Sequence, residues 1–211
     1  MFAEIDPPRV PSPGPAQVAI VGNAPEAGDH ARAIDAADWV VRFNNAVGFG
    51  GRAGRRTTHL ALVNRGGQMR EWLEDGAFAR RPLVAGAGAF LLPFPPDAGR
   101  GHAASADGRD WTRDAARALR PLGRPIRLLP HALHREARRT LGHEFGACDP
   151  NPSTGFLVAF HLHRQLRGSG ARIAVYGFGF AGWPGHPWAA ERAWFTERER
   201  EGALRLVPLR D

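Results

Sequence analysis

QVAIVGN (residues 17–23) and WVVRFNN (residues 39–45) each contain a short, mainly apolar run that ends in residues favouring a turn. Runs of this length, closed by Gly or Asn, are typical of buried strands that enter a loop. Further strands are predicted at residues 57–63, 82–85, 125–129, 172–176 and 204–207. The pattern indicates a series of short strands distributed along the chain.

Segments with the apolar spacing of helices lie between these runs. Helices are predicted at residues 29–37 with Asp29 as N-cap, and at residues 68–74, 111–119, 132–141, 156–166 and 188–200. Residues 92–110, rich in Pro, Gly, Ala and Asp, are predicted to form a long mobile loop. Strands that alternate with helices predict an α/β fold, a mostly parallel sheet flanked by helices. In such sheets ligands bind beyond the carboxyl ends of the strands.

Length and composition indicate one domain at residues 17–211, preceded by a proline-rich, disordered leader at residues 1–16. No apolar stretch approaches the eighteen or so residues of a membrane span, and the leader lacks the apolar core of a signal peptide. The single cysteine, Cys148, excludes an internal disulfide and fits a reducing compartment. A cytoplasmic protein is therefore expected.

The chain carries a formal net charge of +7, and all 28 of its basic residues are Arg. A charge of this size can indicate a nucleic-acid partner, which is recognised by clustered basic residues. Here the Arg residues are scattered and form no long basic block. No nucleic-acid partner is expected, and attraction of a small anionic substrate explains the charge equally well.

Polar residues that can hold phosphate follow two of the predicted strands and precede one predicted helix. Asn23 follows the first strand and Asn44 the second, and an Asn amide can donate to a phosphate oxygen. NPSTG (residues 151–155) precedes the helix at residues 156–166, where hydroxyl and backbone N–H groups favour an anion. Each feature alone has a simpler interpretation, since Asn is a common turn residue and Ser a common N-cap.

The sequences of these segments also resemble the motifs of a known family. VAIVGNAP (residues 18–25) with VVRFNNAVGFGGRAGRRTTH (residues 40–59) is similar to the long motif of the eukaryotic-type sialyltransferases, glycosyltransferase family 29. PSTGFLVAFHLH (residues 152–163) with IAVYGFG (residues 173–179) is similar to the short motif. HPWAAE (residues 186–191) is like the last motif, H-x4-E, and the three segments occur in the family's order.

The resemblance implies a Rossmann-like, GT-A-type sialyltransferase fold and inverting transfer of a sialic acid or Kdo-type sugar from a CMP-activated donor to a glycan acceptor. It implies that His186 is the catalytic base and that Glu191 orients this base or positions its loop. The implied donor-binding residues are Asn23 and Asn44 for phosphate and ribose, Ser153, Thr154 and Gly155 in the nucleotide site, and Tyr176 and Gly177 in its wall. No cofactor and no metal is expected, because amides, hydroxyls and a helix N-terminus can stabilise a single leaving phosphate.

The chain departs from the family pattern in three places. Only about ten residues separate Tyr176 from His186, so a further His/Tyr motif of the family is missing or merged with the last motif. By spacing, His186 fits the histidine of either motif. Val18 stands where the first cysteine of the family's disulfide would be, and no membrane anchor precedes the domain. These departures leave open an alternative, a non-catalytic nucleotide-binding accessory protein that retains the fold. The oligomeric state is not predicted.

Other interpretations have less support. Residues 177–182 match G-x-G-x-x-G, but WPG follows instead of a helix, which argues against a dinucleotide enzyme. His161 and His163 point to different faces of a helix, and the pair His131 and His134 lacks a neighbouring ligand pattern. Ser153 is not in a G-x-S-x-G sequence, so no hydrolase elbow is indicated.

Overall fold

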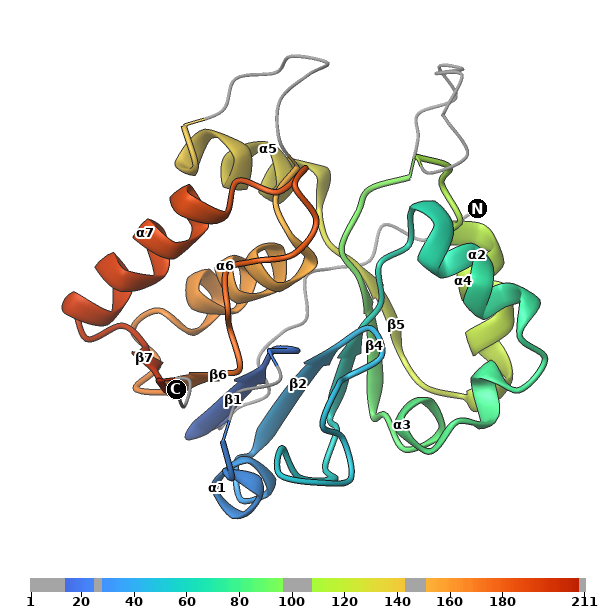
Figure 1. The fold of residues 1–211 in the computed structure, drawn as a ribbon, viewed down its shortest axis with the longest axis horizontal. Coiled ribbons are helices and arrows are strands. Elements are labelled where there is room, and N and C mark those ends of the chain that lie inside the picture. Colours follow the sequence, from blue (N-terminus) through green and yellow to red (C-terminus); the bar gives the residue numbers. More distant parts are fainter. Residues whose placement is uncertain (1–13, 25–27, 97–107, 143–150, 209–211) are drawn as a thin grey trace.

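A computed structural model describes residues 14–24, 28–96, 108–142 and 151–208 of the chain (Figure 1). Most of the predicted leader, Cys148 and residues 97–107 of the predicted loop lie outside these described residues. At the beginning of the described part, the backbone N–H groups of Ala16 and Gln17 both donate to the Asp38 carboxylate at 2.8 Å. This contact ties the start of the first strand to the start of the second.

The centre of the fold is a sheet with the strand order β5-β4-β3-β2-β1-β6-β7. The strands are β1 (Gln17–Val21), β2 (Trp39–Phe43), β3 (His59–Ala61), β4 (Ala89–Leu92), β5 (Ile126–Leu128), β6 (Arg172–Tyr176) and β7 (Arg205–Leu206). Every pair of neighbouring strands is parallel, which confirms the predicted α/β fold with its parallel sheet.

Helices cover both faces of this sheet (Figure 1). One face carries α5 (His131–Thr140), α6 (Thr154–Leu166) and α7 (Trp188–Arg200). The other carries α1 (Ala31–Asp35), α2 (Gly66–Glu74), α3 (Pro82–Ala85) and α4 (Thr112–Leu119). Buried side chains alternate between the faces, because successive residues of a strand point to opposite sides: Val18 and Ile20 pack toward the α6 side, and Ala19 and Val21 toward α1.

The order in which the chain adds strands to the sheet reverses between β1 and β6. From β1 the sheet extends through β2 to β5 on one side, and the chain then returns to place β6 and β7 on the other side. The loops that leave β1 and β6 therefore diverge, and such a switch point opens a crevice at the carboxyl ends of the strands. Ligand sites of open α/β sheets occur at this position.

One strand prediction is wrong. Residues 82–85 form α3, and the strand β4 follows at Ala89–Leu92. Pro82 occupies the first turn of the helix, where its fixed φ and missing N–H are tolerated. The four residues of β4 are all buried, so they show no polar alternation, and β4 ends where the long loop was predicted to begin.

Smaller differences concern the ends of elements. Asp29 does not cap α1, since the N-cap position is His30 and no side-chain cap bond is present there. The strand predicted at residues 57–63 is shorter than expected, since β3 covers only His59–Ala61. Just before β3, Val40 N donates to Thr58 Oγ1 at 2.8 Å instead of to a backbone carbonyl. The remaining predicted elements differ from the observed ones by a few residues at most.

Buried histidines make the fold sensitive to acid. Burial lowers the pKa of His161 in α6 to about 4, and the same cause, aided by nearby Arg side chains, lowers the pKa of His59 and His134 to about 4. An unfolded histidine has a pKa of about 6.5. The stability that these neutral rings contribute is therefore present above about pH 6.5 and is lost as the pH falls toward 4.

We expect the free energy of unfolding to fall by about 2 kcal/mol for His161 alone between about pH 7 and about pH 5. His161→Leu should remove this part of the pH dependence, which urea unfolding at both pH values would measure. Leu162→Ala on the same helix provides the control, because it removes buried apolar surface but no titrating group and should leave the pH dependence unchanged. Identical pH dependence in wild type and His161→Leu would contradict the prediction.

Candidate functional site

A cavity of about 450 Å³ lies at the switch point, beyond the carboxyl ends of β1, β2 and β6 and beside the start of α6. The sequence-predicted site residues that line it are Asn23, Asn44, Ser153, Thr154, Gly155, Gly177, His186 and Glu191. Two further hollows have volumes of about 640 and 650 Å³. One runs along α7 and shares Phe180 and Trp188 with this cavity, and the other lies beside the first residues of β1 and β6. The switch-point cavity is the candidate site, because it alone among the three contains the predicted cluster of polar groups.

The two strands at the switch point are joined by a close backbone approach. Gly22 N donates to Tyr176 O at 2.7 Å and Ala24 N to Gly177 O at 2.9 Å. A Cβ on Gly22 would lie 2.4 Å from Gly177 O, closer than real side chains permit. Gly177 itself has a φ of +65°, which favours glycine. These two glycines therefore allow the two backbone segments to approach closely, so that backbone atoms form the floor of the cavity.

The start of α6 presents hydrogen-bond donors to the cavity. Ser153 is the N-cap, and its Oγ accepts from Phe156 N at 3.0 Å. The N–H groups of Thr154 and Gly155 have no acceptor among the described residues, and both residues line the cavity. Free N–H groups at a helix N-terminus, together with the helix dipole, form a site that favours an anion.

His186 is held in one tautomer. Its Nδ1 lies 2.6 Å from the carbonyl oxygen of Asn151, and because a carbonyl only accepts, Nδ1 carries the proton. The rings of Trp183 and Trp188 pack edge-on against the imidazole, each with a centroid distance of 4.9 Å. Burial lowers the pKa of His186, while the hydrogen bond to Asn151 opposes this change. The lowered pKa favours the neutral ring near pH 7, and Nε2 has no hydrogen-bond partner among the described residues.

The two asparagines have different surroundings. Asn23 links two loops: its Nδ2 donates to Phe43 O at 3.2 Å, and its Oδ1 accepts from Val47 N at 3.0 Å. Asn44 lies in the left-handed region with a φ of +54°, and its Oδ1 accepts from Val63 N at 2.9 Å. The Asn44 Nδ2 has no acceptor among the described residues. Asn44 thus offers its Nδ2 as a donor at the cavity, whereas Asn23 mainly fixes the shape of the cavity.

Tyr176 does not line the cavity, contrary to the prediction from sequence. It is buried on the α1 face of the sheet, with its ring centroid 5.4 Å from that of His30. Neighbouring residues of a strand point to opposite faces, and Val175 is the one that packs toward α6. The resemblance located the end of the strand correctly but not the direction of its last side chain.

Aromatic residues form a wall of the cavity that sequence reasoning did not identify. Phe43 and Phe178 line the cavity and pack edge-to-face with ring centroids 5.9 Å apart. A Cβ on Gly155 would lie 3.2 Å from the Phe178 ring, so α6 and this ring are in close contact. The sequence signal that could have identified this wall is the YGFGF run (residues 176–180) at the end of β6. Aromatic faces of this kind can stack against a nucleobase.

Glu191 lies on α7 and is 1% exposed, and it binds Ser153. Ser153 N donates to one carboxylate oxygen at 2.7 Å, and Ser153 Oγ donates to the other at 2.8 Å. Burial raises the pKa of Glu191, and the two hydrogen bonds from Ser153 oppose this rise. The carboxylate therefore positions the start of α6 and has no hydrogen bond to His186 among the described residues.

We expect Glu191→Ala to destabilise the protein by about 2–4 kcal/mol, because it leaves the buried Ser153 N–H without an acceptor and opens a cavity. Glu191→Gln should cost less than about 1 kcal/mol, since an amide can bond both Ser153 groups and removes the cost of a buried charge. Urea unfolding of the two variants measures the difference. Equal destabilisation by both would contradict the positioning role.

Comparisons with known proteins define the class of fold. The structure matches the crystal structure of a mammalian sialyltransferase with a TM-score of 0.59 and 20% sequence identity, covering 92% of this chain and 70% of that chain. The architecture is thus an α/β fold of the sialyltransferase type, and this likeness establishes the fold alone. In sequence, the chain is 28% identical over 199 residues to the urease operon 23 kDa accessory protein of Rhizobium meliloti (strain 1021), covering 90% of this chain and 92% of that protein. No family model matches the chain.

The alternative sites weighed from the sequence have no further structural support. Among the described residues, no group of three or more His, Cys, Asp or Glu side chains is placed to hold a metal ion. Residues 177–182 do not open a helix, and α7 begins only at Trp188. Within the same part of the chain, no helix is both long enough and apolar enough to cross a membrane.

Proposed function

We propose that the protein is an inverting glycosyltransferase that moves a sialic acid or Kdo-type sugar from a CMP-activated donor to a glycan acceptor. The observation that carries this proposal is the position of His186 in the same cavity as the anion-favouring start of α6. Its lowered pKa favours a neutral imidazole, and its Nε2 has no partner among the described residues. A base and a phosphate site that share one cavity are the two groups that this reaction needs.

The donor would occupy the switch-point cavity with its phosphate at α6. The Thr154 and Gly155 N–H groups and the Asn44 amide would donate to the phosphate and ribose, and Phe178 would offer a face to the cytosine. These neutral donors stabilise the negative charge that the departing CMP acquires, without a metal in the proposed mechanism.

In the transfer step, His186 Nε2 takes the proton of an acceptor hydroxyl as its oxygen forms a bond to the anomeric carbon of the donor sugar. The bond from that carbon to the phosphate oxygen breaks, and CMP leaves with the electron pair. The Asn151 carbonyl stabilises the imidazolium that forms, because it accepts from Nδ1 in both protonation states. Attack opposite the leaving group inverts the anomeric centre.

A second candidate function is a non-catalytic accessory protein that binds a nucleotide. The similarity to a urease operon accessory protein along most of both chains favours this alternative. So does the short segment between β6 and His186, which leaves few residues to build an acceptor site. Both candidates predict CMP binding, and they differ in turnover.

Calorimetric titration with CMP and a donor-hydrolysis assay with CMP-sialic acid and CMP-Kdo separate the two candidates. CMP binding together with turnover that depends on His186 supports the transferase. CMP binding without turnover supports the accessory protein. Lack of CMP binding at millimolar concentration would reject both.

A further inference from the structure

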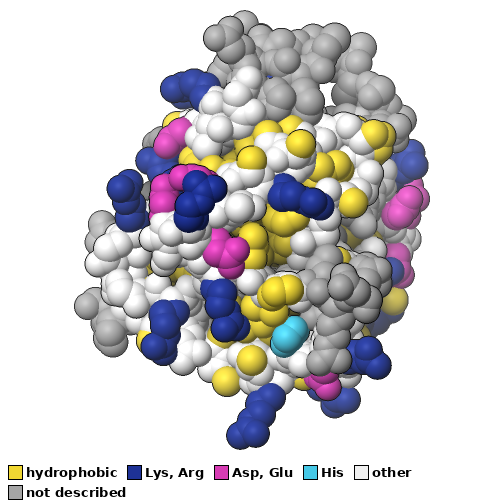
Figure 2. All heavy atoms as spheres, turned by 60° about the vertical axis from the view of Figure 1, so that its left-hand side comes forward, with side chains coloured by type: hydrophobic (Ala, Val, Ile, Leu, Met, Phe, Trp, Pro, Cys, Tyr) yellow, Lys and Arg dark blue, Asp and Glu magenta, His cyan; other side chains and the backbone are white. Residues whose placement is uncertain are grey.

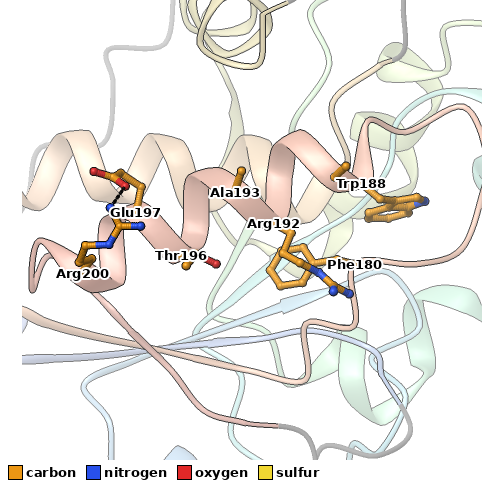
Figure 3. A pocket seen from close by; sticks show the side chains of 8 residues that line it. Phe180, Trp188, Arg192, Ala193, Thr196, Glu197 and Arg200 are labelled. Carbon is orange, nitrogen blue, oxygen red and sulfur yellow. Dashed lines mark ion pairs between the residues drawn. The ribbon is translucent and has the colours of Figure 1, made fainter.

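A hollow of about 640 Å³ runs along the exposed side of α7, and Figure 3 shows the side chains that line it. Phe180 and Trp188 line both this hollow and the candidate donor cavity, so they form the boundary between them. Trp188 also packs against the His186 ring with a centroid distance of 4.9 Å. The hollow therefore begins next to the proposed base and leads away from it along the helix.

The side chains of this hollow come largely from one stripe of α7. Trp188, Arg192, Thr196 and Arg200 are spaced four residues apart, which places them on the same side of the helix. The stripe covers thirteen residues from Trp188 to Arg200, or about 18 Å of helix. A chain of several sugar units could lie along it with one end at His186.

Arg192 carries the available positive charge in this hollow. Its guanidinium carbon lies 5.5 Å from the centroid of the Phe180 ring, and its Nη2 makes a long hydrogen bond of 3.4 Å to Gly179 O. It has no carboxylate partner among the described residues. Arg200, at the far end, is neutralised by Glu197 at 2.8 Å, the ion pair drawn in Figure 3.

Aromatic surface also lies beside the proposed base. Trp183 is 59% exposed and packs edge-on against the His186 ring. Figure 2 shows that basic side chains stand around hydrophobic surface on the side of the molecule that bears α5, α6 and α7. Aromatic faces next to a hydroxyl-activating base suit the apolar face of a sugar ring, and an unneutralised guanidinium suits a carboxylate, sulfate or phosphate.

We propose that the hollow along α7 binds the acceptor and that this acceptor is an acidic saccharide whose anionic group binds to Arg192. The inference rests on the proposed transferase function and adds the acceptor class to it. The sugar beside Trp188 presents its hydroxyl to His186 Nε2, and the anionic group pairs with Arg192 one helical turn away. Arg192 is thus a specificity-determining residue, outside the donor site.

The test uses lactose and lactose monosulfate, a pair that differs only in the anionic group, titrated by NMR into the full chain with CMP present. Wild type is expected to bind the sulfated sugar at least about tenfold more tightly, since hydrogen bonds to charged groups are the stronger kind. Arg192→Gln should remove this preference and leave lactose binding unchanged. Arg117→Gln is the matched control, because Arg117 is exposed on α4 on the opposite face.

Equal affinity for the two sugars in wild type, or a preference that persists in Arg192→Gln, would overturn the inference. Inorganic sulfate is included, and binding of sulfate as tight as that of the sulfated sugar would also overturn it, because the saccharide would then contribute nothing. The measurement detects binding, so it gives a result even without turnover. Failure of the proposed function is recognised separately, by the absence of CMP binding or donor hydrolysis in wild type.

Discussion

His186→Asn is expected to lower the rate of sugar transfer by roughly 100- to 10,000-fold, the usual contribution of a general base. An Asn amide can still donate to the Asn151 carbonyl, so the loop keeps its main hydrogen bond while the Nε2 lone pair is lost. Affinity for CMP should stay unchanged, because the donor groups lie on α6 and after β2. Steady-state kinetics with a CMP-sugar and calorimetry with CMP measure the two quantities.

The pH profile of the same pair provides an independent readout. Burial lowers the pKa of His186, so wild-type kcat/KM should stay constant down to a pH below the ordinary histidine range and fall only as the ring becomes protonated. The residual activity of His186→Asn should lack this acidic limb. His131→Ala, at an exposed position of α5, should keep both the rate and the profile. An acidic limb that persists in His186→Asn would assign the base to another group.

Arg42→Ala is expected to destabilise the protein by about 3–5 kcal/mol, the range found when one partner of a buried charged network is removed. Arg42 is fully buried in β2, and its guanidinium donates to Ala53 O at 2.6 Å and to Arg56 O at 2.9 Å. Arg42 Nη2 lies 3.9 Å from a carboxylate oxygen of Asp35, which balances its charge. The same carboxylate also accepts from Arg55 N at 3.0 Å. Truncation leaves buried carbonyls without donors and a cavity behind β2.

Urea unfolding measures this loss, and Arg52→Ala is its control. Arg52 is exposed in the same loop, so its removal should change stability by less than about 0.5 kcal/mol. The loop also carries Val47, whose N–H binds Asn23 at the cavity, so Arg42→Ala should weaken CMP binding as well. Equal stability of the two variants would show that the buried guanidinium does not hold the loop.

The strand and helix pattern was largely predictable because this sheet is built from short local units. Apolar runs closed by Gly and Asn identified β1, β2 and β6, and the spacing in residues 188–200 identified α7. The failure at α3 and β4 has a local cause: a helix of four residues has too little periodicity to be distinguished from a strand. Since β4 is fully buried, its residues lack the alternation that marks a half-exposed strand.

The site was predictable only as a set of segments. The order of the three motifs brought the loops after β1 and β2, the start of α6 and His186 into one expected site, and the switch-point cavity contains all of them. The roles within the set needed partners that lie far away in sequence. Glu191 binds Ser153 across 38 positions, and Asn23 binds Phe43 and Val47 across twenty or more.

The sequence by itself determined the parallel α/β architecture, the polar loops at the strand ends and the histidine that follows them, because these depend on local periodicity and on the order of motifs. Tertiary structure decided which of those residues face the cavity. It turned Tyr176 toward α1 and bound the Asn23 side chain to the backbone of Phe43 and Val47. It left Asn44 Nδ2 without an acceptor among the described residues. The physical reason is that a side chain's direction and its free hydrogen-bonding capacity are set by the neighbours that folding brings to it.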